Sequence, residues 1–136
     1  MDKYEFYLES HNLTAIDNPQ EVDVANVLEA LHPNHNAYVI LSRSDGSYLQ
    51  TAGSKTNLTV EWREAKNTSF IHWVLGKGEI QEQTTLVHCD VGPITVRVNE
   101  LLSLNDAKNA FFMFLAKGKV PKDFTLRDNT QLFMDD

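Results

Sequence analysis

Residues 99–127 read NELLSLNDAKNAFFMFLAKGKVPKDFTLR and contain a helix with both ends marked. Ser103 is a good N-cap residue, and Asp106 three positions later completes a pattern like the capping box. Gly118 is a natural C-terminal stop, and Pro121 prevents the helix from continuing. The apolar residues between these signals recur at helical spacing, at Leu104, Ala107, Phe111, Phe114 and Leu115. The block therefore predicts a helix that buries one face and is followed by an ordered tail.

The first third of the chain predicts one strand and one helix. Residues 4–9 alternate in a way that is typical of a strand with one solvated face. Asn18-Pro19 can cap and open a helix, because proline in the first turn loses no needed hydrogen bond. An apolar stripe over residues 24–31 continues this helix until His32-Pro33 ends it.

From residue 37 onward the apolar period changes to two. Segments 38–42 and 48–51 flank Asp45-Gly46, which tolerates the positive φ angles of a tight hairpin turn. Residues 58–63 predict the next strand, and residues 70–75, apolar on both faces apart from His72, predict a central one. Segments 86–91 and 94–98 predict a last strand pair around Gly92-Pro93. The connections are too short for crossover helices, so the sheet is expected to be antiparallel.

The predicted fold is thus a single α+β domain over residues 1–136. An antiparallel meander of about six strands packs against an N-terminal and a C-terminal helix. Hydrophobic residues make up 42% of the chain and charged residues 23%, which is ordinary for a globular domain. The net charge of −7 argues against nucleic acid or an anionic membrane as partner, since both attract Lys and Arg. The N-terminus has no signal-peptide pattern, so a cytoplasmic protein is expected.

No stretch has the spacing of a catalytic, metal or phosphate site. Cys89 is the only cysteine, and a hydrolase would need His72 to reach it from a neighbouring strand. His72, His88 and Asp90, or His32 with His35, lack a recognisable ligand spacing, so we expect no metal and no cofactor. Whether His72, His88 and Cys89 are more than structural stays open at this point.

The order of these pieces resembles a known family. The meander segment YVILSRSDGSYLQTAG, then LTVEWRE, leads into a closing helix with a Phe-Leu-x-x-Gly-x-x-Pro-x-x-x-x-Leu-Arg exit. The residues that carry the closing pattern are Val98, Ala107, Phe111, Phe114, Leu115, Gly118, Pro121, Leu126 and Arg127. Over about residues 21–127 this resembles the bacterial immunity proteins of polymorphic toxin systems, specifically the first-numbered immunity class. These are small cytoplasmic proteins that neutralise a cognate secreted toxin, often a nuclease or nucleic-acid deaminase.

The resemblance implies a non-enzymatic inhibitor that binds one toxin domain stoichiometrically. A toxin that acts on nucleic acid has a basic groove for phosphates, and an acidic protein can be steered into it. The carboxylates we expect to bind the partner are Glu61 and Glu64 on the meander, with Glu79 and Glu82 in the next connection. The inhibitor is expected to be a monomer or a homodimer. A ligand-binding or regulatory accessory domain with a pocket between sheet and helix is the alternative, and a small cysteine-dependent hydrolase is a weaker one.

Overall fold

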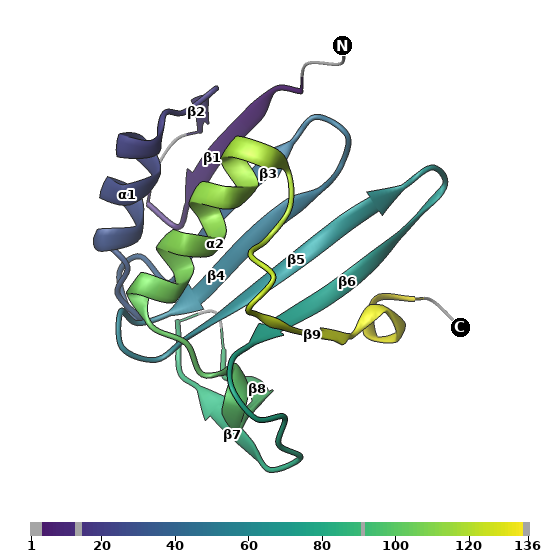
Figure 1. Cartoon of the computed structure of the whole chain (residues 1–136). Coiled ribbons are helices and arrows are strands. Elements are labelled where there is room, and N and C mark those ends of the chain that lie inside the picture. Colours follow the sequence, from purple (N-terminus) through teal and green to yellow (C-terminus); the bar gives the residue numbers. More distant parts are fainter. Residues whose placement is uncertain (1–3, 13–14, 91, 135–136) are drawn as a thin grey trace.

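The computed structural model describes residues 4–12, 15–90 and 92–134. It has two layers, a seven-stranded antiparallel sheet and a pair of α-helices (Figure 1). The elements in chain order are β1 (Phe6–Ser10), β2 (Ile16–Asp17), α1 (Glu21–Glu29), β3 (Tyr38–Arg43), β4 (Tyr48–Gly53), β5 (Leu58–Lys66), β6 (Ser69–Gly76), β7 (Thr84–Val87), β8 (Ile94–Arg97), the 3-10 turn η1 (Val98–Glu100), α2 (Leu104–Lys117), β9 (Thr125–Asp128) and the 3-10 turn η2 (Thr130–Phe133). The α+β class and the antiparallel sheet are confirmed.

The strand prediction was too simple. The main sheet has the order β2-β1-β3-β4-β5-β6-β9, so its two edges come from the two ends of the chain. The β7–β8 pair does not extend the meander and forms a separate ribbon. The predicted strand over residues 86–91 ends at Val87, and Val91 lies outside the described residues. Neither helix is terminal, because two strands precede α1 and a strand follows α2.

The hairpin and the closing helix form as predicted. Asp45-Gly46 turns β3 into β4 with Gly46 at φ 97°. In α2 the Ser103 hydroxyl accepts a hydrogen bond from the Asp106 backbone N–H, and Asp106 accepts one from the Ser103 N–H, which closes the capping box. The start of α1 was predicted two residues early. Gln20 is its N-cap, and Asn18 instead takes a left-handed φ of 48° and accepts a hydrogen bond from the Phe6 N–H.

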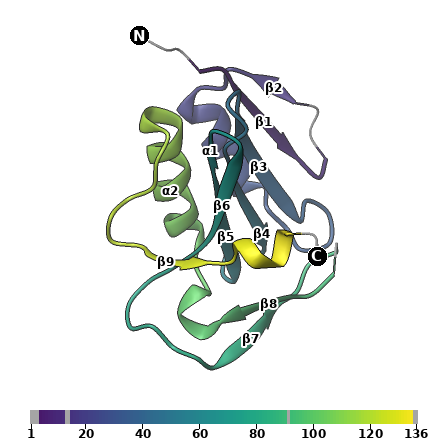
Figure 2. The ribbon, with the colours of Figure 1, turned by 90° about the vertical axis from the view of Figure 1, so that its right-hand side faces the viewer.

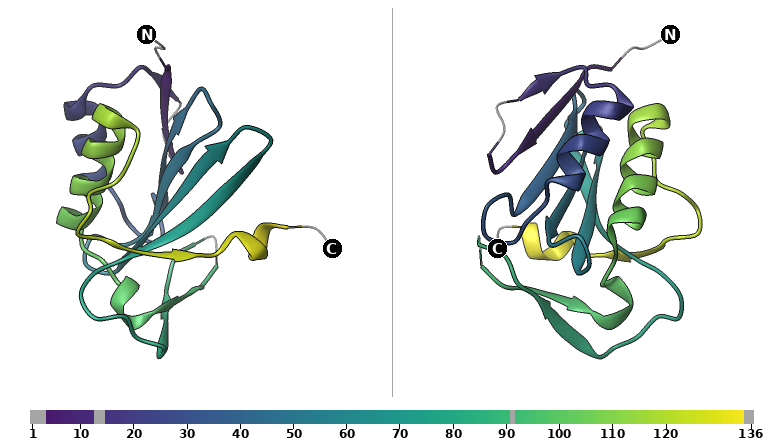
Figure 3. Two further views of the ribbon diagram at one scale, coloured as in Figure 1. Left: turned by 45° about the vertical axis from the view of Figure 1, so that its right-hand side comes forward. Right: turned by 90° about the vertical axis from the view of Figure 1, so that its left-hand side faces the viewer.

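One continuous core lies between the helices and the face of the sheet that they cover (Figures 2 and 3). Phe111 and Phe114 of α2 are fully buried against it, and the Phe114 ring meets Phe6 edge-on at 5.8 Å between centroids. Leu41 of β3, Leu49 of β4 and Trp62 of β5 are buried in this core and lie side by side, since Leu49 pairs with Leu41 on one side and with Trp62 on the other. Both α-helices lie on this face, and within the described residues the opposite face of the same strands carries no α-helix (Figure 3).

Two features of the structure favour glycine at the end of α2. Gly118 has φ 72°, and a Cβ there would collide with the Arg43 guanidinium. Gly78 has a similar φ of 69° but open space around it. We expect Gly118→Ala to lower the free energy of unfolding by more than the about 1 kcal/mol that a left-handed alanine costs alone.

Gly78→Ala is the matched control, because its added methyl group meets no neighbouring atom and only the left-handed backbone conformation costs free energy. Urea denaturation of both variants measures the comparison. Equal losses in the two variants would show that Arg43 moves aside freely.

Candidate functional site

The surface that stands out is the sheet face away from α1 and α2, which we call the open face (Figure 3). Its strand residues alternate with the core residues, and most of them are partly exposed. Ala52, Thr59, His72 and Val74 on this face are buried. The open face includes three tyrosines and a row of aliphatic, aromatic and polar side chains, namely Tyr7, Glu9, Tyr38, Ile40, Tyr48, Gln50, Glu61, Arg63, Phe70 and His72. The C-terminal turn η2 lies on this side of the sheet, as the yellow segment in Figure 3 shows.

A buried histidine is at the centre of the covered part of the open face. His72 is 1% exposed, and its Nε2 lies 2.6 Å from Glu61 Oε1. Arg63 Nε donates to His72 Nδ1 at 3.2 Å. Because a guanidinium can only donate, Nδ1 must be the acceptor, and Nε2 carries the proton that is given to Glu61. Both imidazole nitrogens are thus hydrogen-bonded.

Aromatic rings surround this polar cluster. The Phe133 ring of η2 lies 4.1 Å from the His72 ring, centroid to centroid. The Arg63 guanidinium lies 3.9 Å from the Phe70 ring centroid and 4.8 Å from that of Phe133. These contacts attach the end of the chain to the open face, while Phe133 stays 41% exposed and Leu132 73%. An exposed apolar edge of this kind is typical of a protein-binding surface.

A buried ion pair holds β9 at the end of the sheet. Glu100 is 2% exposed, and Arg127 donates to both of its oxygens, Nε to Oε2 at 2.7 Å and Nη2 to Oε1 at 2.9 Å. These hydrogen bonds raise the pKa of Arg127, so its guanidinium stays charged. Beside it a cavity of about 340 Å³ lies between the open face, β8 and η2. Glu61 and Arg127 both line this cavity.

The β1–β2 edge of the open face is acidic. Glu5, Glu9 and Asp17 are exposed, and none of the ion pairs among the described residues includes them. Tyr7, 38% exposed, donates to Glu5 Oε2 at 3.3 Å. The negative charge of Glu5 and the hydrogen bond to it raise the pKa of Tyr7, with a smaller contribution from Asp17. This edge therefore combines an aromatic ring with carboxylates that have no ion-pair partner in the described part of the chain.

The four predicted partner-binding carboxylates do not form one surface. Glu61 lies on the open face and is bonded to His72. Glu64 lies on the other face, where it accepts from Trp73 Nε1 at 3.3 Å and pairs with Lys66. Glu79 and Glu82 are exposed in the connection between β6 and β7. That they contact a partner stays a prediction, but Glu61 and Glu64 cannot do so together on one face.

Two other predicted groupings are not brought together. His72 pairs across the sheet with Arg63, whereas Cys89 lies in the turn between β7 and β8 and its Sγ is 3.2 Å from the Gly92 carbonyl oxygen. The neighbouring-strand arrangement that a cysteine hydrolase would need is therefore not formed, since β6 and β7 belong to different sheets and Cys89 lies outside β7. His88 and Asp90 lie outside the strands, and no three His, Cys, Asp or Glu residues within the described ranges are arranged to hold a metal.

The open-face tyrosines and the acidic edge were missed as a site. The alternation of residues 4–9 indicates a strand with one solvated face, but it does not show which strands lie beside it in the sheet. Compared with known proteins, the chain matches no family model and no curated sequence. In the part of the chain that the structure describes, no helix has the length and apolarity to cross a bilayer.

Removing the Glu61 carboxylate should destabilise the protein. Glu61→Ala leaves the buried His72 Nε2–H without its acceptor, which costs about 1–3 kcal/mol of unfolding free energy. Glu79→Ala removes an equal charge from an exposed loop and should change stability by less than about 0.5 kcal/mol. Chemical denaturation of both proteins decides this, and an equal, small effect would show that His72 finds another acceptor.

Removing one member of the buried ion pair should cost more. Arg127→Met leaves Glu100 buried without its counter-charge, and we expect a loss of about 3–5 kcal/mol. The double variant Arg127→Met/Glu100→Met removes both charges and should recover most of that loss. Thermal and urea unfolding measure both. A double variant that is as unstable as the single one would contradict the electrostatic explanation.

Proposed function

We propose that this chain is an immunity protein, a non-catalytic inhibitor that binds the toxin domain of its cognate secreted toxin on the open face. The observation that carries the proposal is the sheet face without a helix, with partly exposed tyrosines, an exposed apolar turn and an acidic edge. Tyrosine and phenylalanine are enriched in protein interfaces because they bury a large rigid area at low entropic cost. The resemblance of residues 99–127 to the immunity class is the reason why we propose a toxin domain as the partner.

Charge supports a basic partner. The chain carries a net charge of −7, and Glu5, Glu9 and Asp17 lie at the rim of the open face without an ion-pair partner among residues 4–12, 15–90 and 92–134. Such rim charges act mainly on the association rate and on partner choice. A nuclease or deaminase toxin presents Lys and Arg for phosphates, so the inhibitor would occupy the groove that otherwise binds nucleic acid. Inhibition then requires only tight binding and no reaction.

The apolar edge supplies affinity that charge does not. Phe133 and Leu132 lie beside the cavity that Glu61 and Arg127 line. A partner side chain that covers these residues removes apolar surface from water at the β6–β9 side of the open face. Buried aromatic anchors of this kind dominate the energy of an interface, while the charged rim contributes less.

The proposal requires that a reading frame beside this chain's gene encodes a secreted protein with a C-terminal toxin domain, and the test uses that domain, purified separately. The protein should abolish the toxin's activity at a one-to-one ratio, and surface plasmon resonance should show an association rate that falls as salt increases. Glu5→Lys/Glu9→Lys should weaken the complex by about tenfold or more, because it places positive charge on the acidic edge. Absence of any complex would refute the immunity function.

Glu79→Lys/Glu82→Lys is the matched control, because it changes the net charge equally in an exposed loop that is not part of the sheet. It also tests the two loop carboxylates predicted from the sequence. A larger effect in this variant than in the β1 variant would move the interface from the open face to the β6–β7 connection. The immunity function itself would survive that result.

A further inference from the structure

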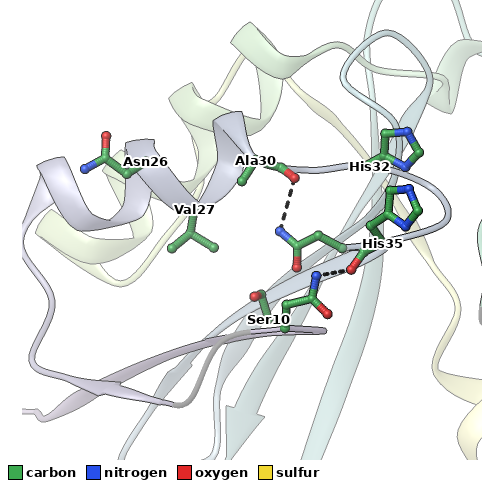
Figure 4. A pocket seen from close by; sticks show the side chains of 8 residues that line it. Ser10, Asn26, Val27, Ala30, His32 and His35 are labelled. Atoms are coloured by element: carbon green, nitrogen blue, oxygen red, sulfur yellow. Dashed lines mark hydrogen bonds between the residues drawn. The ribbon is translucent and has the colours of Figure 1, made fainter.

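The cavity between the open face, β8 and η2, which we call the η2 cavity, has charged groups as well as apolar surface in its wall. Its volume of about 340 Å³ is at the lower end of the range for cavities that hold ligands. Two charged side chains, Glu61 and Arg127, line it. The larger cavity of about 450 Å³ beside His32 and His35 differs, because no Asp, Glu, Lys or Arg is among the described residues that line it (Figure 4). Of these two cavities, the η2 cavity is therefore the one whose wall indicates the charge of an occupant.

The charges at the η2 cavity leave one carboxylate in excess. Arg127 donates to both oxygens of the buried Glu100. These hydrogen bonds raise the pKa of Arg127 most, and the nearby charge of Glu61 raises it further. Two carboxylates thus share one guanidinium, and the group of three carries one negative charge more than it can neutralise. A cation is the occupant that balances it.

Glu61 has one carboxylate oxygen available for such a cation. Its Oε1 is bonded to His72, and no hydrogen bond within residues 4–12, 15–90 and 92–134 includes Oε2. Arg63, the other guanidinium near this carboxylate, is bonded to the second nitrogen of the His72 ring and does not line the cavity. The Glu61 side chain is only 20% exposed, so folding has already removed most of its water. Pairing it with a cation then requires little further dehydration of the carboxylate, which is a large part of the cost of burying an ion pair.

The rest of the wall fits an apolar stem. Val74 and Val96 are buried beside the cavity, and Ile94 is half-buried. Leu132 and Phe133 of η2 also line the cavity and are exposed, so a partner can reach it from this side. An aliphatic stem with a charged end is the composition of a lysine or arginine side chain.

We propose that the η2 cavity receives one lysine or arginine side chain of the toxin domain, with its stem against Val74, Ile94 and Leu132 and its charge at Glu61. This contact rests on the proposed function, and it gives the two acidic regions of the open face different roles. The exposed β1–β2 edge increases the rate of association, whereas Glu61 slows dissociation because its ion pair is enclosed in the complex.

Glu61→Gln removes the charge and keeps an acceptor for His72, because the amide oxygen can take the place of Oε1. In surface plasmon resonance with the toxin domain, this variant should increase the dissociation rate by about tenfold or more and change the association rate by less than about twofold. Glu21→Gln is the matched control. It removes the same charge from an exposed position at the start of α1, on the other side of the sheet, and should change neither rate (Figure 3).

Filling the cavity should have the same effect as removing the charge. Ile94→Trp places a large ring in the cavity and should increase the dissociation rate by about tenfold or more, because the partner side chain can no longer enter. Leu86→Trp adds the same ring to the paired strand β7, at a position that does not line the cavity, and should leave the complex unchanged.

Double-mutant cycles identify the partner side chain. Each lysine and arginine of the toxin domain is changed to methionine, which keeps an apolar stem, and is measured against wild-type protein and Glu61→Gln. One of these substitutions should weaken the wild-type complex by about tenfold or more and have little effect on the Glu61→Gln complex.

The outcomes separate this contact from the function on which it rests. A Glu61→Gln complex with the wild-type dissociation rate, or cycles in which no toxin cation is coupled to Glu61, would overturn the cavity contact and leave the immunity function intact. An effect of Glu61→Gln on the association rate alone would make Glu61 a steering charge and would also overturn it. If wild-type protein forms no complex with the toxin domain, the immunity function is refuted and the cavity contact with it.

Discussion

The strand pleat is the constraint on which the rest of this structure depends. Successive side chains point to opposite faces, so a strand that buries Leu41 or Leu49 under the helices must present Ile40 or Tyr48 on the other side. Both helices pack on the same face, because α2 places Phe111 and Phe114 in the core that α1 shares. The second face is thereby left for other contacts. The proposed partner surface exists because of this one-sided covering.

Polar groups on the open face are arranged so that burial costs little. His72 faces a carboxylate on one side and a guanidinium on the other, and all three come from adjacent antiparallel strands. The Phe133 ring then covers the imidazole without leaving a donor or acceptor unpaired. The Arg127–Glu100 pair does the same at the neighbouring strand. These two clusters hold η2 and β9 in place and so shape the cavity between them.

Most local signals in the sequence predicted the structure correctly, although Asn18-Pro19 placed the start of α1 two residues early, and the distant contacts could not be predicted. Asp45-Gly46 predicts a hairpin because the turn conformation depends on two adjacent residues. Ser103, Asp106 and Gly118 mark α2 because capping acts within one helical turn. By contrast, β9 has four residues without a strong apolar alternation, and its place beside β6 depends on contacts such as Arg127 with Glu100, 27 positions apart. The β7–β8 pair has strand-like residues, but nothing local shows that it leaves the main sheet.

The candidate site follows the same division. Strand alternation alone is enough to predict that Glu61 lies opposite Trp62, and that residues 4–9 have a solvated side. It does not predict the hydrogen bond between Glu61 and His72 or the one from Trp73 to Glu64. It also does not predict that Glu5, Glu9 and Asp17 lie together at one exposed edge of the sheet. Helix ends, turns and strand faces are determined by residues that are close in sequence, because backbone propensity and capping are short-range effects. Strand order and the pairing of buried charges depend on which distant residues meet, and only the packed chain brings those residues together.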